Sequence, residues 1–415
     1  MPDSIDQIDM RHSNLALVLA EIIRDPRTRA QLAVDIDMTK GAVGSLVKEL
    51  IDRGLVVLSK AASGGAVGRP GRIVEAVTTR AHAVGISFSP PYVIGTAVDL
   101  AGNVVAREKV TLTERNTPIE TLIEITRAIT ARLHSAVLAS SPSSVLAGVA
   151  VGVPDLVDPS AGVVRRSPTI GLTDYPLVRA LKSALNELTD VITIDNDATY
   201  GAVAEARWLG ADGGRNLLYL TGSTAMGGGI VANGVPFRGS TGYAGEVGHM
   251  VINPDGKLCV CGNLGCWESE IGLNTFLALA AEPEDPVRDA TIDGNERITA
   301  IVQRANAGDR RALQAIGQVA RYLGLGLASL INIFNPDTVI LGGYFIRLFP
   351  FLIDPVQQIV QQRVLSDQLL QCRILHSELE MYAAAIGAGI SAIDAFAADP
   401  TAVPLVTDVV AVGAY

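Results

Sequence analysis

Cysteine, charge and long apolar runs are all scarce in this sequence of 415 residues. Only 4 residues are cysteine, which excludes a small scaffold held together by disulfides. Charged residues make up 18% and hydrophobic residues 48%, a balance that excludes an intrinsically disordered chain. The longest uncharged stretch, Asn216 to Phe237, is interrupted by glycines, so it lacks the apolar density of a membrane span. The composition is typical of a soluble globular protein.

A secretion signal is also missing from the first residues. Asp3, Asp6 and Asp9 occupy the place where a signal peptide needs a basic start and an apolar run. We therefore expect a cytoplasmic, reducing environment.

Charge is unevenly distributed along the chain. The net charge is −10, but residues 10–80 carry 11 Lys and Arg against 7 Asp and Glu, whereas the rest carries 22 against 36. A basic head on an acidic body suggests a nucleic-acid-binding module fused to a second unit. At about 150 residues per domain, the length fits two or three domains. We predict a DNA-binding domain over 10–80, a body over 81–397 and a C-terminal tail over 398–415.

Three short amphipathic helices are predicted within the head. In the first, apolar residues recur at helical spacing from Leu15 to Ile23, and the pattern ends at Asp25-Pro26. Thr28 and Gln31 form a capping-box signature for the second helix, and Thr39 is the predicted N-cap of the third. Two short helices joined by a tight turn are typical of a helix-turn-helix, although three such helices are also common structural filler.

The third helix would present the residues that face the DNA groove. Its apolar residues face inward at Val43, Leu46, Val47 and Leu50. Polar residues and glycines therefore lie on the outward face of the helix. Two glycines lower the helix propensity, so we expect sparse readout of bases and more phosphate contacts. The candidate DNA-binding residues of this helix are Thr39, Lys40, Gly41, Gly44, Ser45 and Lys48.

A basic hairpin follows the helices. Strands predicted over 55–58 and 73–77 flank a Ser/Gly loop that contains Gly68-Arg69-Pro70-Gly71-Arg72. A narrow, extended, cationic tip suits the DNA minor groove, where negative potential attracts arginine. Taken alone, the segment could equally be a basic loop without a partner, but directly behind a helix-turn-helix it indicates a wing. Arg69 and Arg72 complete the candidate DNA-binding set.

Strands and helices alternate through the body, which favours an α/β fold. A long helix is predicted from Thr117-Pro118 to about Leu138. A hairpin over 216–231 carries Ser223, Thr224 and three consecutive glycines, whose N–H groups and hydroxyls suit a phosphate. Alone that signal is weak, because most glycine-rich turns only reverse the chain. The other predicted strands cover 83–86, 92–99, 104–112, 145–153 and 191–194.

The sharpest motif is a cluster of cysteines with a histidine upstream. Cys259, Cys261 and Cys266 fall within eight residues, and His249 lies ten residues before the first of them. One histidine and three thiolates make a closed tetrahedral set, which is typical of structural zinc. The alternatives are free buried cysteines or a redox pair. We predict that these four residues bind a structural Zn²⁺ and that Cys372 belongs to the core.

Acids and an amide surround this cluster. Glu246 and Glu268 flank it in sequence, and Asn196-Asp197 closely follows the predicted strand over 191–194. Each residue singly could be a helix cap or a solvated side chain. Together they offer the acceptors that recognise a polyhydroxylated ligand, so the set favours a sugar site.

These motifs resemble those of the ROK family (repressors, uncharacterised frames and sugar kinases). The similarity is to its winged helix-turn-helix branch, the sugar-responsive repressors of the xylose and N-acetylglucosamine type. It extends from the head to about Ala395, and the cysteine pattern with its upstream Glu-x-Gly-His is highly specific. The matching segments are Gly152-Val153-Pro154, Asn196-Asp197-Ala198, Gly245-Glu246-Val247-Gly248-His249, Cys259-x-Cys261-Gly262-x-x-Gly265-Cys266-x-Glu268, Asn332-Ile333-Phe334-Asn335-Pro336-Asp337 and Leu341-Gly342-Gly343.

The resemblance implies an actin/hexokinase-like fold of two lobes, about 81–200 plus 380–397 and about 201–379. His249 would contact zinc and sugar through opposite ring nitrogens. Binding to operator DNA with inverted half-sites would require at least a homodimer. The residues implied to hold the sugar in the cleft are Asn196, Asp197, Glu246, His249 and Glu268.

The sequence departs from the kinases of this family at the nucleotide end. Where they carry Asp-x-Gly-Gly-Thr-Lys, this chain has Ser87-Phe88-Ser89-Pro90-Pro91-Tyr92, which lacks the metal-assisting carboxylate and contains two residues without an N–H. In the second hairpin Ser223 and Ala225 replace the usual glycines. Asp197, the general base of the kinases, would here act only as a hydrogen-bond acceptor.

We therefore expect no catalytic residues. The first hypothesis is a DNA-binding transcriptional regulator, foremost a repressor, that is controlled by a small sugar. An ATP-dependent sugar kinase with a DNA-binding head is the alternative if the segment 87–92 can hold ATP, and a third hypothesis is control by a docked transport protein. Asp155 and Thr169 replace the usual Gly and Asn, and Thr169 bears on which sugar binds.

Overall fold

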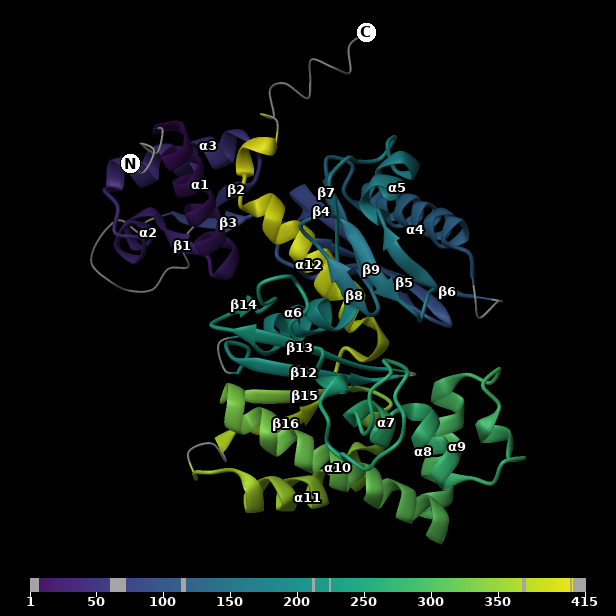
Figure 1. The fold of residues 1–415 in the computed structure, drawn as a ribbon. Coiled ribbons are helices and arrows are strands. Elements are labelled where there is room, and N and C mark those ends of the chain that lie inside the picture. The colour runs from purple at the N-terminus through teal and green to yellow at the C-terminus, as the bar shows by residue number, and fades with distance from the viewer. Residues whose placement is uncertain are drawn as a thin grey trace.

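The computed structural model describes residues 7–59, 72–112, 117–210, 213–223, 225–367, 371–403 and 405. A small N-terminal unit of helices and a three-stranded sheet precedes a large α/β body that contains two five-stranded sheets (Figure 1). The mixed α/β class predicted from the sequence is confirmed.

The N-terminal unit begins its helices where the sequence predicts. Thr28 and Gln31 form the capping box, and Thr39 Oγ1 accepts the N–H of Ala42 at 3.2 Å. The apolar stripe of the first helix packs against the buried face of the third, so the helices share one core. The helices are α1 (Gln7–Arg24), α2 (Arg29–Asp35) and α3 (Lys40–Asp52).

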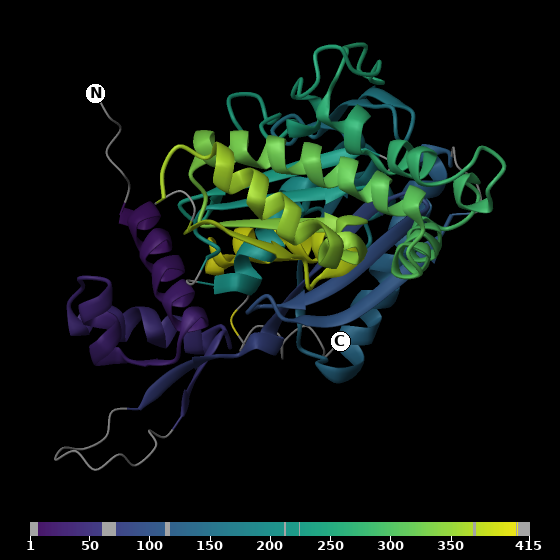
Figure 2. The same cartoon turned by 90° about the horizontal axis from the view of Figure 1, so that it is seen from below.

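A twisted hairpin completes this unit. Strands β2 (Val56–Ser59) and β3 (Ile73–Ala76) pair antiparallel, and β1 (Arg27–Thr28) adds to the outer edge of β3. The hairpin projects away from the body (Figure 2). Most of the predicted wing tip, residues 60–71 with Arg69, lies outside the described residues, whereas Arg72 is described and exposed.

The first sheet of the body has the strand order β11-β7-β4-β5-β6. Its strands are parallel from β11 to β4 and antiparallel from β4 to β6. Helix α4 (Ile119–Ser140) packs on its outer face, and α5 (Leu177–Ala184) packs beside β11 (Figure 1). The strands are β4 (Ala81–Ser89), β5 (Tyr92–Asp99), β6 (Val104–Thr111), β7 (Val145–Val153) and β11 (Ile192–Asn196), with a small sheet of β8 (Leu156–Asp158), β9 (Val163–Ser167) and β10 (Leu172–Tyr175) alongside.

The second sheet has the order β14-β13-β12-β15-β16 and includes the predicted glycine-rich hairpin. Helices α10 and α11 pack side by side beneath it (Figure 1). The strands are β12 (Leu217–Gly222), β13 (Met226–Ala232), β14 (Val235–Pro236), β15 (Thr338–Gly343) and β16 (Arg373–His376), and the helices are η3 (Val247–His249), α7 (Trp267–Ile271), α8 (Leu273–Ala280), η4 (Pro286–Arg288), α9 (Gly294–Asn306), α10 (Arg310–Phe334) and α11 (Phe345–Arg363).

Two helices fill the space between the sheets. Helix α6 (Asp197–Leu209) packs on β12 and β13, whereas α12 (Ala383–Ala397) packs on β4, β5, β7 and α6 (Figure 1). A Cβ at Gly85 would lie 1.9 Å from the Ala385 carbonyl oxygen, so only glycine permits this close approach. The lobe boundary predicted near residue 200 falls inside α6, so the two lobes share a continuous helix.

Two arginines connect the N-terminal unit to the body. Arg80, in η1 (Thr78–Arg80), donates to the carbonyls of Arg53 and Ser143. Arg53 in turn donates to the carbonyls of Thr401 and Val403. The first part of the predicted tail therefore packs on the N-terminal unit, through η7 (Pro400–Ala402), while 404 and 406–415 lie outside the described residues.

Among the described helices, α10 is long and apolar enough by length and composition to cross a membrane. The same test is passed by core helices of soluble proteins, and 56% of its most apolar window is buried. Its buried residues pack against α7, α8 and α11, which is the environment of a core helix.

Candidate functional site

The outward face of α3 carries the residues predicted to contact DNA. Thr39, Lys40, Gly41, Ser45 and Lys48 are exposed, and Gly44 is half-buried. A Cβ at Gly41 or at Gly44 would meet no atom of the described chain within 4 Å. Packing within the protein therefore does not require glycine at either position, and the face is open to a partner.

The predicted metal ligands come together. One ligand atom each from His249, Cys259, Cys261 and Cys266 lies within 4.8 Å of all the others. His249 ends the short helix η3, and Cys266 immediately precedes α7, so two ordered elements position the cluster. A β-bridge between Leu258 and Leu264 folds the intervening loop back on itself.

The spacing of these atoms suits a tetrahedral metal ion. Cys261 Sγ lies 3.6 Å from Cys266 Sγ, and Cys259 Sγ lies 3.6 Å from His249 Nδ1. Ligands about 2.3 Å from a tetrahedral zinc ion would be about 3.7 Å apart. The cluster can therefore hold a metal ion of that size, and it leaves the other nitrogen of His249 for a different partner.

That second nitrogen faces the predicted sugar residues. His249 Nε2 lies 3.9 Å from Glu246 Oε2. Burial, with the charges of Asp155, Asp197 and Glu268 adding to it, raises the pKa of Glu246 to about 7. Burial also raises the pKa of Asp197 to about 6, although a hydrogen bond from the Ala198 N–H opposes it. The carboxylates that stood apart in the sequence thus form one acceptor-rich cluster.

Asn196 and Glu268 are partly used by the fold. Asn196 is the N-cap of α6, accepting the N–H groups of Ala198 at 2.9 Å and Thr199 at 3.1 Å. One oxygen of Glu268 accepts the N–H of Met226 at 2.8 Å. Both therefore position backbone around the cluster, which is the structural role that the sequence left open for each residue singly.

Asp155 is a member of the cluster that the predicted set lacks. It has a left-handed φ of 70°, a conformation that glycine adopts without strain, and its carbonyl accepts the Asn196 Nδ2–H at 2.9 Å. Its carboxylate accepts the Ser167 hydroxyl at 2.7 Å and the Thr169 N–H at 3.2 Å. The two departures Asp155 and Thr169 thus contact each other, and only the Gly-to-Asp change could have identified Asp155 from the sequence.

The segment 87–92, which replaces the first phosphate motif, ends in a contact with the start of α9. The hairpin of β4 and β5 turns at Pro90-Pro91, and the Tyr92 hydroxyl donates to the carboxylate of Asp293. Asp293 is itself the N-cap of α9 in the second lobe. Lys109 Nζ lies 4.5 Å from the centre of the Tyr92 ring, a cation–π contact that also holds the ring in place. The Tyr92–Asp293 contact therefore connects the first hairpin of the body to the start of α9.

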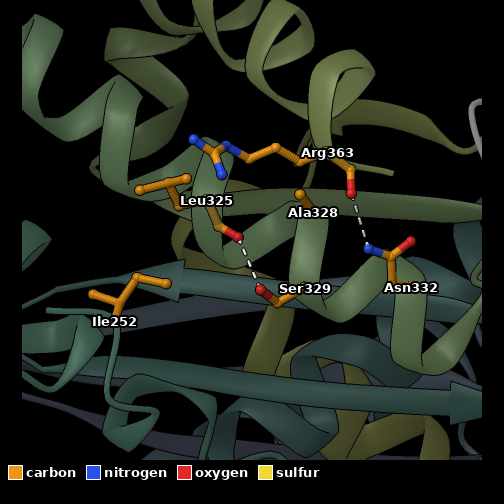
Figure 3. Close-up of a pocket in the computed structure, with 6 residues that line it drawn as sticks. All are labelled: Ile252, Leu325, Ala328, Ser329, Asn332 and Arg363. Atoms are coloured by element: carbon orange, nitrogen blue, oxygen red, sulfur yellow. Dashed lines mark hydrogen bonds between the residues drawn. The ribbon is translucent and has the colours of Figure 1, made fainter. Parts of the chain in front are cut away.

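Two cavities lie away from this cluster. The smaller, about 300 Å³, is at the surface of α10 and α11 and is lined by Ile252 and Arg363 among others (Figure 3). Asn332 donates to the Arg363 carbonyl at 3.2 Å across its edge (Figure 3). The larger, about 660 Å³, lies beside the N-terminal unit. Both are lined by residues other than the predicted sugar set.

Comparisons with known proteins find relatives that match most of the length of this chain. It is 32% identical over 383 residues to a putative xylose repressor of Caldicellulosiruptor sp. (strain Rt8B.4), covering 89% of this chain and 93% of that protein. It is 30% identical over 399 residues to the xylose repressor of Bacillus subtilis (strain 168), covering 95% and 98%. A crystal structure of a ROK family transcriptional regulator, a homologue of the E. coli MLC protein, has the same fold with a TM-score of 0.76 at 22% identity, covering 94% of this chain and 97% of that one. Since the ROK family pattern itself matches residues 84–395, this chain belongs to the ROK family.

Proposed function

We propose that this protein is a DNA-binding transcriptional repressor whose affinity for operator DNA is set by a small sugar bound between its lobes. One observation carries the proposal. The similarity to two xylose repressors covers 89% and 95% of this chain, so it includes the N-terminal unit as well as the body. A repressor that binds chromosomal DNA would act in the cytoplasm.

The surface of α3 supports the DNA-binding part. Lys40 and Lys48 can neutralise phosphates, while Ser45 and the two glycines leave room for the duplex to approach. Arg69 and Arg72 of the predicted wing would add minor-groove contacts. Inverted half-sites would be matched by a homodimer or a higher homo-oligomer.

The acceptor cluster supports the sugar part. Hydroxyl groups are donors, and Asp155, Asp197 and Glu246 supply carboxylates, with the charge of Asp155 helping to raise the pKa of both Asp197 and Glu246. Asn196, His249 and Glu268 would complete the site, with Glu268 mainly holding the Met226 backbone. Because the cluster lies where β11 and α6 meet the second lobe, a bound sugar would favour one arrangement of the lobes over another.

We infer that the metal is Zn²⁺ with a structural role. Three thiolates and one imidazole leave no open position for a substrate, and the atoms fit its bond lengths. A bound ion would fix the start of η3 at Glu246 and the start of α7 at Glu268 relative to each other. No catalysis is proposed, because the segment 87–92 lacks the carboxylate that assists the metal-bound nucleotide and its Tyr92 is hydrogen-bonded to Asp293.

The central test measures DNA binding and sugar response together. Duplexes selected by the protein from a random pool serve as operators, and fluorescence anisotropy is measured with xylose, glucose or N-acetylglucosamine. Asp197→Ala should keep DNA binding and lose the sugar response, because it removes a hydroxyl acceptor. Lys48→Ala and Arg69→Ala should weaken DNA binding and lower its salt dependence, with sugar affinity kept. The proposal fails if no duplex is enriched, or if both classes of variant lose DNA binding equally.

A coupled ADP-release assay with the same sugars addresses the kinase alternative. We expect no sugar-dependent ATP turnover, since phosphoryl transfer depends on positioning and charge stabilisation at the altered hairpin. A robust phosphorylated product would favour the kinase. Sedimentation velocity on the free protein would give the oligomeric state, with a dimer as the minimum expected.

A further inference from the structure

The larger cavity joins the N-terminal unit to the body. It has a volume of about 660 Å³, within the range of small-molecule sites. Arg24, the last residue of α1, lines one side, and residues of α6, α12, 214–215 and 231–238 line the others. Four of its lining residues are arginines, Arg24, Arg207, Arg215 and Arg238, and they come from segments far apart in the sequence.

The four arginines differ in how fully their guanidinium groups are paired with carboxylates. Arg207 donates to both oxygens of Asp394, at 2.6 and 2.7 Å, and Arg238 Nε donates to Asp195 at 2.7 Å. Arg24 pairs with Glu21 at 3.0 Å, but 70% of its side chain remains exposed. Arg215 is exposed, and its side chain makes no hydrogen bond or ion pair with the part of the chain that the structure describes. The cavity therefore has guanidinium donors in excess.

We propose that this cavity binds a small phosphate-bearing anion, at a site separate from the sugar cleft. Guanidinium groups bind phosphate through paired, charge-assisted hydrogen bonds, and several converging arginines are the residue type suited to it. Gly210, Gly214 and Gly234 on the wall add no side chain that would fill the space. The site goes beyond the proposed repressor function, which needs only DNA and a sugar.

We assign the bound phosphate group to a free metabolite and not to the DNA backbone. The backbone of DNA has the same oxyanion chemistry, but the residues predicted to face DNA lie on α3 and the wing, and the lining of the cavity contains none of them. Arg238 also holds Asp195, which is buried and directly precedes Asn196. An anion at Arg238 would therefore compete with a contact that supports the acceptor cluster, while its contact with Arg24 would reach the N-terminal unit.

The test titrates full-length protein with inorganic phosphate, ribose 5-phosphate and ribose by calorimetry, at an ionic strength held constant with NaCl. Arg215→Ala and Arg24→Ala remove exposed donors from the cavity. Arg310→Ala is the matched control, because Arg310 is also an exposed arginine and lies at the start of α10, outside the cavity. Asp197→Ala controls for binding in the sugar cleft.

Phosphate and ribose 5-phosphate should bind the wild type, Arg310→Ala and Asp197→Ala alike. The Kd should rise about tenfold or more in Arg215→Ala and Arg24→Ala, as expected for the loss of a charge-assisted hydrogen bond. Absence of binding to the wild type overturns the proposal. So does ribose 5-phosphate binding that is lost in Asp197→Ala and kept in Arg215→Ala, which would put it in the sugar cleft. If the two arginine variants change only the affinity for selected duplexes, the cavity contacts DNA instead.

Discussion

Gly44 is a residue that lowers the stability of its own helix although packing does not require it. Glycine inside a helix is less favourable than alanine, and a methyl group at Gly44 would meet nothing within 4 Å. Nothing inside the described protein therefore accounts for it. A duplex lying against α3 would, because it needs the same space.

Gly44→Ala should stabilise the protein by about 1 kcal/mol in urea unfolding, owing to the higher helix propensity of alanine. DNA affinity should fall, since the added methyl group separates α3 from the duplex. Gly317→Ala is the matched control, because Gly317 lies within α10, where a Cβ also meets nothing. That variant should gain similar stability with unchanged DNA affinity; equal DNA affinity in all three proteins would contradict our account of Gly44.

His82 is a buried residue whose ionisation opposes folding. Its Nδ1 lies 2.9 Å from Ser144 Oγ and its Nε2 lies 2.9 Å from His134 Nδ1. Burial, with a smaller effect of His134, lowers the pKa of His82 from 6.5 to about 4. The neutral ring is thus favoured in the folded state.

The unfolded chain should therefore take up a proton first as the pH falls. This contribution to stability is complete above about pH 6.5 and is lost between about pH 6.5 and pH 4, by as much as about 3 kcal/mol. Urea unfolding of the wild type and His82→Asn across this range is the measurement. The variant should show a shallower dependence on pH, and an identical slope would exclude His82 as its source.

At the scale of elements, the loop that carries Cys259 and Cys261 connects α7 to the acceptor cluster. Cys266 precedes α7, whose second residue Glu268 accepts the Met226 N–H of β13. Loss of the metal should therefore loosen a strand and a helix together. The effect would reach the sugar site through His249.

Cys261→Ser should lower the zinc content from about one ion per chain to about none and reduce the Tm, because structural zinc contributes folding free energy. Sugar affinity should fall with it. Cys372→Ser is the matched control, since Cys372 lies outside the cluster. Elemental analysis and thermal unfolding give both values, and freshly purified wild type without zinc would end the assignment.

Local patterns predicted elements well because their causes are local. The Thr28–Gln31 capping box, the buried stripe of α3 and the ligand spacing of the cysteines each depend on residues close together in the chain. Cys372 was expected in the core and is half-buried at its edge. The Tyr92–Asp293 contact spans 201 positions, and no periodicity or motif encodes such a pair.

The residues of the acceptor cluster, unlike those elements, were not predicted from local spacing. Its residues were identified by chemical type and by family resemblance, but which carboxylates are free depends on packing. Only the fold shows that Glu268 is committed to Met226 and that Asp155 joins the group. Those facts arise when β7, β11, β13 and α7 meet, which residue spacing alone does not determine.

At the scale of the whole molecule, Arg53 and Arg80 are placed to transmit a change in the body to the N-terminal unit that we propose binds DNA. Arg80 contacts Ser143 of the first lobe and the last turn of α3 at Arg53. Arg53 contacts the segment after α12, and Glu49 of α3 as well. The N-terminal unit is thus attached to the first lobe and to the helix between the lobes.

Arg53→Ala should uncouple DNA binding from sugar binding. The ratio of DNA affinities without and with sugar, about 5- to 150-fold in typical coupled proteins, should fall toward one, while calorimetry still detects sugar binding. Arg310→Ala should keep the ratio of the wild type. A full sugar response in Arg53→Ala would show that coupling takes another route.

Helix α12 also has a consequence for biosynthesis. It covers β4, β5 and β7, strands made from the first part of the body, yet it begins about 300 residues after β4 begins. A nascent chain emerging from the ribosome cannot bury that face of the first sheet until residues 383–397 have left the exit tunnel. The helices and hairpin of the N-terminal unit are contiguous in sequence, so they can form while that face of the first sheet is still exposed.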